Sequence, residues 1–311
     1  MEKEKFKHVF GPVPSRRLGR SLGIDLVPFK TCTYDCLYCQ LGRTTDKTVE
    51  RKQYVPLQDV LVEIGRKLDS GASPDYLTLS GSGEPTLYSE LQNLISAIKK
   101  KTSVPLAVLT NGSLLWDKEV QNALLEADLV VPSLDAGDEE AFLYVNRPHP
   151  DITFKKMVEG LVKFRERFSN KIWLEVFLLS RVTGVNSEVE KIISHLKKIR
   201  PHKIQLNTVA RPPAESFASP VPEEQMRKFA EMFGETAEVI ADYRHIHQQE
   251  DFAASRQDVL NMLKRRPCSL TDVAHGLGIH HNLAVKHLEQ LLEEKLITTE
   301  VGDGKVFYLA K

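Results

Sequence analysis

The sequence predicts an α/β protein in which a parallel sheet forms a partial (β/α)6 barrel, followed by a small C-terminal domain. Three observations support this fold class. Short apolar runs alternate with helical patterns over the first two thirds of the chain. Polar motifs stand where several of these runs end, and the pattern changes near residue 255. Strands that alternate with helices in this way build parallel sheets.

Six apolar runs are expected to form the barrel strands. They are short, and their ranges are 22–27, 76–79, 106–109, 129–131, 172–179 and 204–207. Between them, apolar residues recur at helical spacing, which predicts helices over 57–68, 91–98, 120–125, 139–144, 154–168 and 189–199. Because ligands collect at the carboxyl ends of parallel strands, the polar residues that close each strand are the candidates for a site.

The chain is expected to divide into a barrel over residues 1–215, a helical connector over 216–254 and a third domain over 255–311. A helix is predicted over 223–233. In the last domain, Ser269 and Asp272 have the spacing of a capping box at a helix start. Asp303-Gly304 between two apolar runs predicts a hairpin. Three helices and a hairpin resemble a winged helix domain.

Composition excludes some classes of protein. The 311 residues carry 42 Lys and Arg against 42 Asp and Glu, so no global signature of polyanion binding is present. No apolar run approaches the length of a membrane span, and the charged N-terminus lacks the apolar core of a signal peptide. The expected location is the cytoplasm, with no membrane partner.

Three of the four cysteines, Cys32, Cys36 and Cys39, lie in one short segment. Closely spaced cysteines are typical ligands of iron–sulfur clusters. Three thiolates leave one iron of a 4Fe–4S cluster open, which indicates chemistry rather than electron storage. A zinc site or a disulfide framework is the alternative, but both are disfavoured because Cys268 is distant and alone. We interpret Cys268 as an ordinary thiol.

The spacing C-x3-C-x2-C, with the aromatic Tyr38 before the last cysteine, resembles the radical SAM superfamily. The resemblance implies the barrel fold of that family, a 4Fe–4S cluster on the three cysteines, and S-adenosylmethionine (SAM) bound at the open iron. It also implies that the reduced cluster splits SAM to a 5′-deoxyadenosyl radical, which abstracts a substrate hydrogen. Tyr38 is then expected near the adenine, and a reductant such as flavodoxin or ferredoxin is the expected partner.

A second motif follows the second predicted strand. Gly81-Ser82-Gly83-Glu84-Pro85 resembles the GGEP motif of the same superfamily, whose backbone pairs with the SAM amino group. The resemblance carries this cofactor-binding role over to Gly83, Glu84 and Pro85. Glycine suits such an extended edge because it has no Cβ. An ordinary Gly-Pro turn is the alternative.

Polar side chains close the later strands, and the resemblance assigns SAM contacts to this edge of the barrel. The candidates are Asn111, Ser133, Asp135 and Arg181. Arginine suits the methionine carboxylate because its guanidinium binds carboxylates in a bidentate manner. Asn111 and Asp135 are alternatively turn formers, and Glu175 is alternatively a structural ion pair. Arg16 and Arg17 are expected either to contact phosphate or substrate, or to lie in a solvated, glycine-rich segment before the first strand.

Within the superfamily, the segments Ser133-Leu134-Asp135-Ala136 and Asn146-Arg147-Pro148 resemble the tRNA 4-demethylwyosine synthases. A bacterial group of wyosine-synthetase-like Fe–S oxidoreductases is also similar, and the likeness covers about residues 8–215. The chain lacks the N-terminal cysteines that hold a second cluster in the tRNA enzymes. The expected function is a radical SAM enzyme, with a tRNA base as the candidate substrate.

Two alternatives remain open at this point. One is a radical SAM enzyme that modifies or activates a protein or peptide. The other, from a different class, is an iron–sulfur redox sensor that binds DNA through the winged helix; the motifs at the strand ends favour the enzyme. The C-terminal domain over residues 255–311 carries 8 Lys and Arg against 7 Asp and Glu, so nucleic-acid binding, protein contact and a lid on the barrel all remain open for it.

Overall fold

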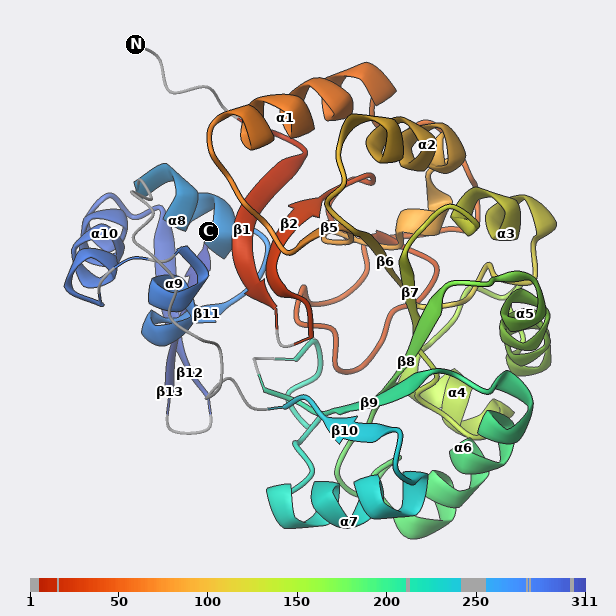
Figure 1. Cartoon of the computed structure of the whole chain (residues 1–311). Coiled ribbons are helices and arrows are strands. Elements are labelled where there is room, and N and C mark those ends of the chain that lie inside the picture. Colours follow the sequence, from red (N-terminus) through yellow and green to blue (C-terminus); the bar gives the residue numbers. More distant parts are fainter. Residues whose placement is uncertain are drawn as a thin grey trace.

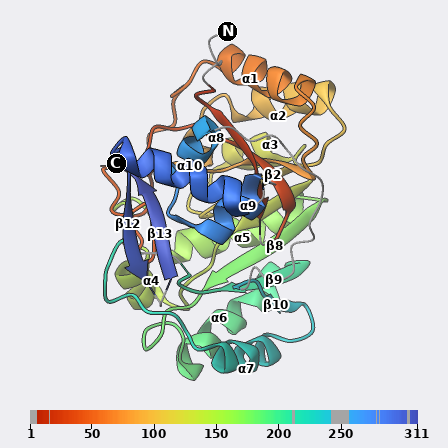
Figure 2. The ribbon, with the colours of Figure 1, turned by 90° about the vertical axis from the view of Figure 1, so that its left-hand side faces the viewer.

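The computed structural model describes residues 6–15, 17–210, 213–241, 256–277, 279, 281–302 and 305–311. An eight-stranded sheet curves into an incomplete barrel with helices on its outer side (Figure 1). A small domain of helices and a three-stranded antiparallel sheet lies beside the first strand (Figures 1 and 2). The predicted fold class is confirmed. Arg16 and the Asp303-Gly304 turn lie outside the described residues.

The strands of the barrel follow the order of the chain. From one edge of the sheet to the other they are β1 (Val9–Ser15), β2 (Gly19–Ile24), β5 (Tyr76–Leu79), β6 (Leu106–Thr110), β7 (Leu129–Pro132), β8 (Lys171–Phe177), β9 (Lys203–Asn207) and β10 (Ala237–Val239). Neighbours from β2 to β10 are parallel, and β1 runs antiparallel to β2. The parallel order brings the carboxyl ends of β2 to β9 to one face of the barrel.

Two strands differ from the sequence prediction. The segment that forms β1 was expected to be a glycine-rich connection, because Pro12 and Pro14 interrupt its apolar pattern. Proline lacks an N–H group and is tolerated in edge strands, which is the position of β1 in the sheet. β10 lies within the expected helical connector over 216–254, but it pairs with β9 and extends the barrel. With only three residues, β10 is too short to show a periodic pattern.

The helices form where the apolar spacing predicts them. They are α1 (Leu57–Asp69), α2 (Leu91–Lys101), α3 (Lys118–Leu124), α4 (Glu139–Val145), α5 (Phe154–Arg167), α6 (Asn186–Ile199) and α7 (Glu223–Phe233). Asp117, Asp138 and Thr153 begin α3, α4 and α5, each accepting a hydrogen bond from a main-chain amide of the first turn. The segments between strands also hold β3 (Thr31–Cys32), β4 (Asp46–Lys47) and the short 3-10 helix η1 (Pro85–Leu87).

The C-terminal domain has the elements expected from its sequence. These are α8 (Arg256–Leu263), β11 (Cys268–Ser269), α9 (Leu270–Leu277), α10 (His281–Glu293), β12 (Ile297–Gly302) and β13 (Lys305–Ala310). The capping box is present: Ser269 Oγ accepts from the Asp272 amide at 3.2 Å, and Asp272 Oδ2 accepts from the Ser269 amide at 3.0 Å. Assignment of this domain to the winged helix class stays a prediction.

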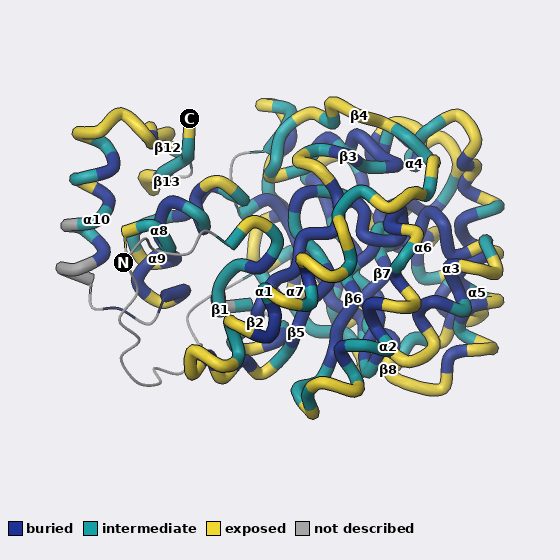
Figure 3. The backbone as a smooth tube through the Cα atoms, turned by 90° about the horizontal axis from the view of Figure 1, so that it is seen from above, coloured by how far each residue is buried: buried dark blue, intermediate teal, exposed yellow. Residues whose placement is uncertain are grey.

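The C-terminal domain packs on the first barrel strand. Val13 of β1 is buried in the same hydrophobic cluster as Leu260, Val273 and Leu288 of the domain. α8 and α9 lie between the barrel and α10, as both the front view and the view from above show (Figures 1 and 3). The C-terminal domain is therefore in contact with the barrel. Among the described residues, we find no helix with the length and apolarity needed to cross a bilayer.

Candidate functional site

A cavity of about 410 Å³ lies within the barrel. Its lining comes from the cysteine segment, from β5, β8 and β9 near their carboxyl ends, from β1 and β2, and from the C-terminal domain just after α8. Six of the predicted site residues line it: Cys32, Cys36, Tyr38, Cys39, Gly83 and Ser133. The fold thus brings the two sequence motifs, which lie about 45 residues apart, to one cavity.

The cysteine thiols lie among amide donors at the edge of this cavity. Asn111 Nδ2 lies 3.6 Å from Cys32 Sγ, and Asn146 Nδ2 lies 3.5 Å from Cys36 Sγ. Burial raises the pKa of all three thiols, that of Cys32 to about 12. Such buried thiols become thiolates when bound cations supply positive charge, as a metal centre does. The donor set therefore fits a metal cluster.

Tyr34 supports the same fit. Its side chain is buried at the cavity, and its hydroxyl has no hydrogen-bond partner among the described residues. A buried hydroxyl normally has a partner, so this one indicates a group that fills the cavity. Within the described ranges, no three His, Cys, Asp or Glu side chains gather around a point that suits one metal ion. A 4Fe–4S cluster does not need such a point, because each cysteine binds a different iron.

The glycines beside the cysteine segment are required by close packing. A Cβ on Gly83 would lie 1.8 Å from the Thr31 carbonyl oxygen, and a Cβ on Gly81 would lie 1.9 Å from Asp25 Oδ1. Gly81 also has a φ of +136°, which favours glycine. The Glu84 amide donates to the Thr31 carbonyl at 3.2 Å. This loop is thus held directly against the first cysteine.

Glu84 and Pro85 do not line the cavity, although both were predicted to contact the cofactor. Glu84 Oε1 accepts hydrogen bonds from the Thr86 amide at 3.0 Å and from Thr110 Oγ1 at 2.6 Å. Its Oε2 accepts from the Asn111 amide at 2.7 Å. Burial raises the pKa of Glu84, and the hydrogen bonds from Thr110 and Thr86 oppose this rise. Glu84 therefore joins the loop after β5 to the end of β6.

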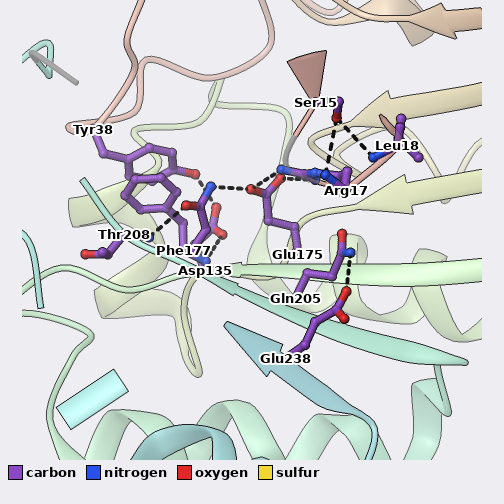
Figure 4. Close-up of polar contacts among 11 residues, drawn as sticks. Ser15, Arg17, Leu18, Tyr38, Asp135, Glu175, Phe177, Gln205, Thr208 and Glu238 are labelled. Atoms are coloured by element: carbon purple, nitrogen blue, oxygen red, sulfur yellow. Dashed lines mark hydrogen bonds and ion pairs between the residues drawn. The ribbon is translucent and has the colours of Figure 1, made fainter. Parts of the chain in front are cut away.

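Tyr38 belongs to a second buried network. Its ring is stacked on Phe177, with ring centroids 3.9 Å apart, and its hydroxyl donates to Asp135 (Figure 4). Asp135 also accepts from the Phe177 amide at 2.9 Å and from Asn146 Nδ2 at 3.0 Å. Burial raises the pKa of Asp135 to about 6, and the hydrogen bond from Tyr38 opposes this rise. Asp135 thus lies behind Tyr38 rather than in the cavity lining.

Arg181 does not line the cavity: it is exposed, with a φ of +61°, in the turn after β8. The arginine that does line the cavity from the β1–β2 connection is Arg17. Its two terminal nitrogens donate to Glu175 at 2.7 Å and 2.9 Å (Figure 4). Asn207 Nδ2 also donates to Glu175, at 2.8 Å. The ion pair that was expected as one interpretation of Glu175 is present, and Glu175 also lines the cavity.

Several residues of the site were not predicted from the sequence. Phe177 and Asn146 surround Tyr38, Asp25 holds the loop at Ser82, and Arg265 lines the cavity from the C-terminal domain. Of these, Asn146 had been noted only as part of a segment that resembles the tRNA enzymes. The sequence does single out Asp25, because it is a charged residue inside the apolar run 22–27. No sequence pattern identified Arg265, because its position at the cavity depends on how two domains pack.

Comparison with known proteins identifies the class. A model of the radical SAM superfamily matches residues 26–196. The chain is 34% identical to UPF0026 protein MJ1312 of Methanocaldococcus jannaschii, over 96% of this chain and 95% of that protein. It is 37% identical to a UPF0026 protein of Helicobacter pylori strain 26695, over the whole of both. The chain therefore belongs to the radical SAM superfamily, and within it to the group of the UPF0026 proteins.

One relative is much longer. A Brachyspira hyodysenteriae protein named GTPase Obg is 37% identical over 98% of this chain, but the match covers 45% of that protein. The chain thus spans less than half the length of this relative. The name describes that longer protein, and nothing of its activity is carried over to this chain.

Solved structures with the same fold are radical SAM enzymes. A radical SAM methyltransferase from Sphaerobacter thermophilus superposes with a TM-score of 0.57 at 14% identity, over 70% of this chain and 65% of that one. The structure of Streptococcus suis SuiB bound to precursor peptide SuiA superposes with a TM-score of 0.55 at 14% identity, over 74% of this chain and 53% of that one. This likeness shows the fold alone. The family, in turn, is one of radical SAM enzymes, whose cofactors are a 4Fe–4S cluster and SAM.

Proposed function

We propose that Cys32, Cys36 and Cys39 hold the 4Fe–4S cluster in this cavity and that SAM lies against the Gly83 edge. The observation that carries this proposal is that all four residues line the same cavity. When bound, the two cofactors supply the 5′-deoxyadenosyl radical that takes a hydrogen atom from the substrate. The family requires a reductant, and we propose flavodoxin or ferredoxin for this role.

The chain's own residues prepare this site. Tyr38, fixed by Phe177 and Asp135, offers an aromatic group to the adenine, and Ser133 offers a hydroxyl within the same lining. Asn111 and Asn146 direct their amide N–H groups at two of the cysteine sulfurs, which favours the thiolate form. The strands of the barrel enclose part of the cavity and so limit the access of bulk water, which favours a radical reaction. We propose that Glu84 positions Asn111, and that Asp135 positions Tyr38 and Asn146, without either carboxylate lining the cavity.

For the substrate we favour a base of tRNA. The support is the likeness of residues 133–136 and 146–148 to the tRNA 4-demethylwyosine synthases. In this chain the two segments meet at the site, since Asn146 donates to Asp135 next to Tyr38. A base within a helix would have to be flipped out to enter the cavity. A peptide substrate is the alternative. A redox sensor is disfavoured, because the family is one of enzymes.

Deuterium transfer tests the substrate class. tRNA would be isolated from a strain that lacks this gene, grown in deuterated medium, and mixed with the reconstituted protein, SAM and dithionite. If the radical acts on a tRNA base, the 5′-deoxyadenosine formed gains deuterium, and the Cys36→Ala variant forms none. A deuterated peptide digest is the matched comparison. Deuterium gained from the peptides but not from the tRNA would replace the RNA proposal by the peptide alternative.

A further inference from the structure

The C-terminal domain supplies part of the cavity wall. Met262, Arg265 and Arg266, at the end of α8 and just beyond it, line the cavity together with Phe10 and Val13 of β1. α10, the helix considered for nucleic-acid binding, lies on the side of the domain away from the barrel (Figures 1 and 3). The part of the domain that reaches the cavity is therefore the end of α8 and the segment just after it.

Arg265 forms a largely buried ion pair with Asp25, the residue that follows β2. The exposed fractions of the two side chains are 15% and 8%. The Arg265 guanidinium also lies over the Phe10 ring at 4.0 Å, and its Nη2 donates to the Lys7 carbonyl at 3.3 Å. Burial lowers the pKa of Arg265 to about 10, so the group is still protonated at neutral pH. Two opposite charges thus stand together in a place with little water.

Asp25 in turn holds the loop between the two glycines. Its Oδ1 accepts a hydrogen bond from the Ser82 amide at 2.6 Å, and its Oδ2 accepts from Ser82 Oγ at 3.0 Å. A Cβ on Gly81 would collide with the same carboxylate. Asp25 therefore fixes the loop on one side through its hydrogen bonds with Ser82. On the other side, the Thr31 carbonyl packs against Gly83 and accepts from the Glu84 amide. Removal of the cation from a buried ion pair leaves an uncompensated charge in a place with little water, which is strongly destabilising.

We infer that Arg265 is a positioning residue of the SAM site, which fixes the Gly81–Gly83 loop through Asp25. The chain of contacts runs from the C-terminal domain to Asp25, from Asp25 to Ser82, and from Ser82 to the Gly83 edge. The docked domain is thus a required part of the cofactor site. This inference rests on the proposed binding of SAM at Gly83.

Hydrogen exchange tests the contact without any cofactor. In the full chain before cluster assembly, Arg265→Met is expected to speed exchange at the Ser82 amide about tenfold or more, because Asp25 loses its cation. Arg256→Met is the matched control. It removes the exposed Arg256–Glu294 pair of the same domain, and exchange at residues 80–84 is expected to stay as in the wild type. Unchanged exchange at Ser82 in Arg265→Met would overturn the inference.

SAM affinity tests the consequence. Arg265→Met is expected to keep a normal iron content but to bind SAM about tenfold more weakly in equilibrium dialysis. Arg265→Lys is expected to show a smaller loss of SAM affinity, because it keeps the positive charge. If Arg265→Met does not fold, Arg265→Lys and Asp25→Asn give the same two measurements. Faster exchange with unaltered SAM affinity contradicts the positioning role. A wild-type protein with a full cluster but no SAM binding would instead refute the proposed function, while the exchange comparison still decides the contact.

Discussion

The two sides of the cavity hold their buried carboxylates in different ways. On the cysteine side, Glu84 and Asp135 are surrounded by hydroxyl and amide donors, and burial raises the pKa of both. On the β1 side, Asp25 and Glu175 are each paired with an arginine from a distant part of the chain. One side is built from neutral hydrogen bonds within the barrel, and the other from ion pairs that tie separate segments together.

This difference shows how the site is assembled. The donors to Glu84 come from its own loop and from the next strand, so they form when two neighbouring strands pair. The Arg17–Glu175 pair joins residues 158 positions apart, and the Arg265–Asp25 pair joins two domains. The ion-paired side therefore depends on the completed tertiary structure. Four predictions test this contrast, from the largest expected effect to the smallest.

The cluster is expected to depend wholly on the cysteine side. Cys36→Ala should abolish assembly of the 4Fe–4S cluster, because an open-iron cluster has no spare protein ligand. Iron content and visible absorption after anaerobic reconstitution measure this. Cys268→Ala is the control: this thiol is buried in the C-terminal domain, and its loss should leave iron content unchanged. Full iron content in Cys36→Ala would refute the ligand assignment.

Breaking the ion pair on the β1 side is expected to destabilise the fold. Arg17→Met leaves the partly exposed Glu175 without its cation but with its hydrogen bond from Asn207, and the free energy of unfolding should fall by about 1–3 kcal/mol. Denaturant unfolding measures the change. Arg227→Met, which removes an exposed helical pair with Glu223, should have no measurable effect. Equal effects of the two substitutions would show that the Arg17 pair is no more than a surface contact.

The carboxylates of the cysteine side predict a pH dependence. Because the pKa of Asp135 is raised to about 6, the folded state binds this proton more tightly than the unfolded state does. The free energy of unfolding should therefore fall as the pH rises from about 4 to about 6, by about 3 kcal/mol from this group. Denaturant unfolding at several pH values measures the slope. Asp135→Asn should remove most of this change of the free energy of unfolding with pH. If the change is the same in Asp135→Asn, it comes from other groups and the prediction is wrong.

The smallest expected effect concerns Tyr38. Tyr38→Phe keeps the ring on Phe177 but removes one of the hydrogen bonds to Asp135, so the free energy of unfolding should fall by about 1 kcal/mol. Iron content should not change. SAM affinity, measured by dialysis, should fall only slightly if the ring is what meets the adenine. Tyr38→Leu, which loses the ring, should weaken SAM binding much more; equal affinity in the two variants would remove Tyr38 from the adenine site.

The sequence predicted those parts of the molecule that depend on local patterns. Helical spacing located α1 to α7, and the cysteine and glycine motifs located one side of the cavity. β1 was missed because its prolines hide the strand pattern. Arg181 was chosen as the cavity arginine because it follows a strand, but a turn carries it to the surface. Arg17 and Arg265 could not be assigned, because their partners are set by how distant segments pack.

The central claim is that the three cysteines and the Gly83 edge form one site for cluster and SAM. The most direct measurement is the formation of 5′-deoxyadenosine after anaerobic reconstitution and addition of SAM and dithionite. We expect the wild type and Cys268→Ala to form it, and Cys36→Ala to form none. A wild-type protein that assembles a complete cluster, yet binds no SAM and forms no 5′-deoxyadenosine, would contradict the account.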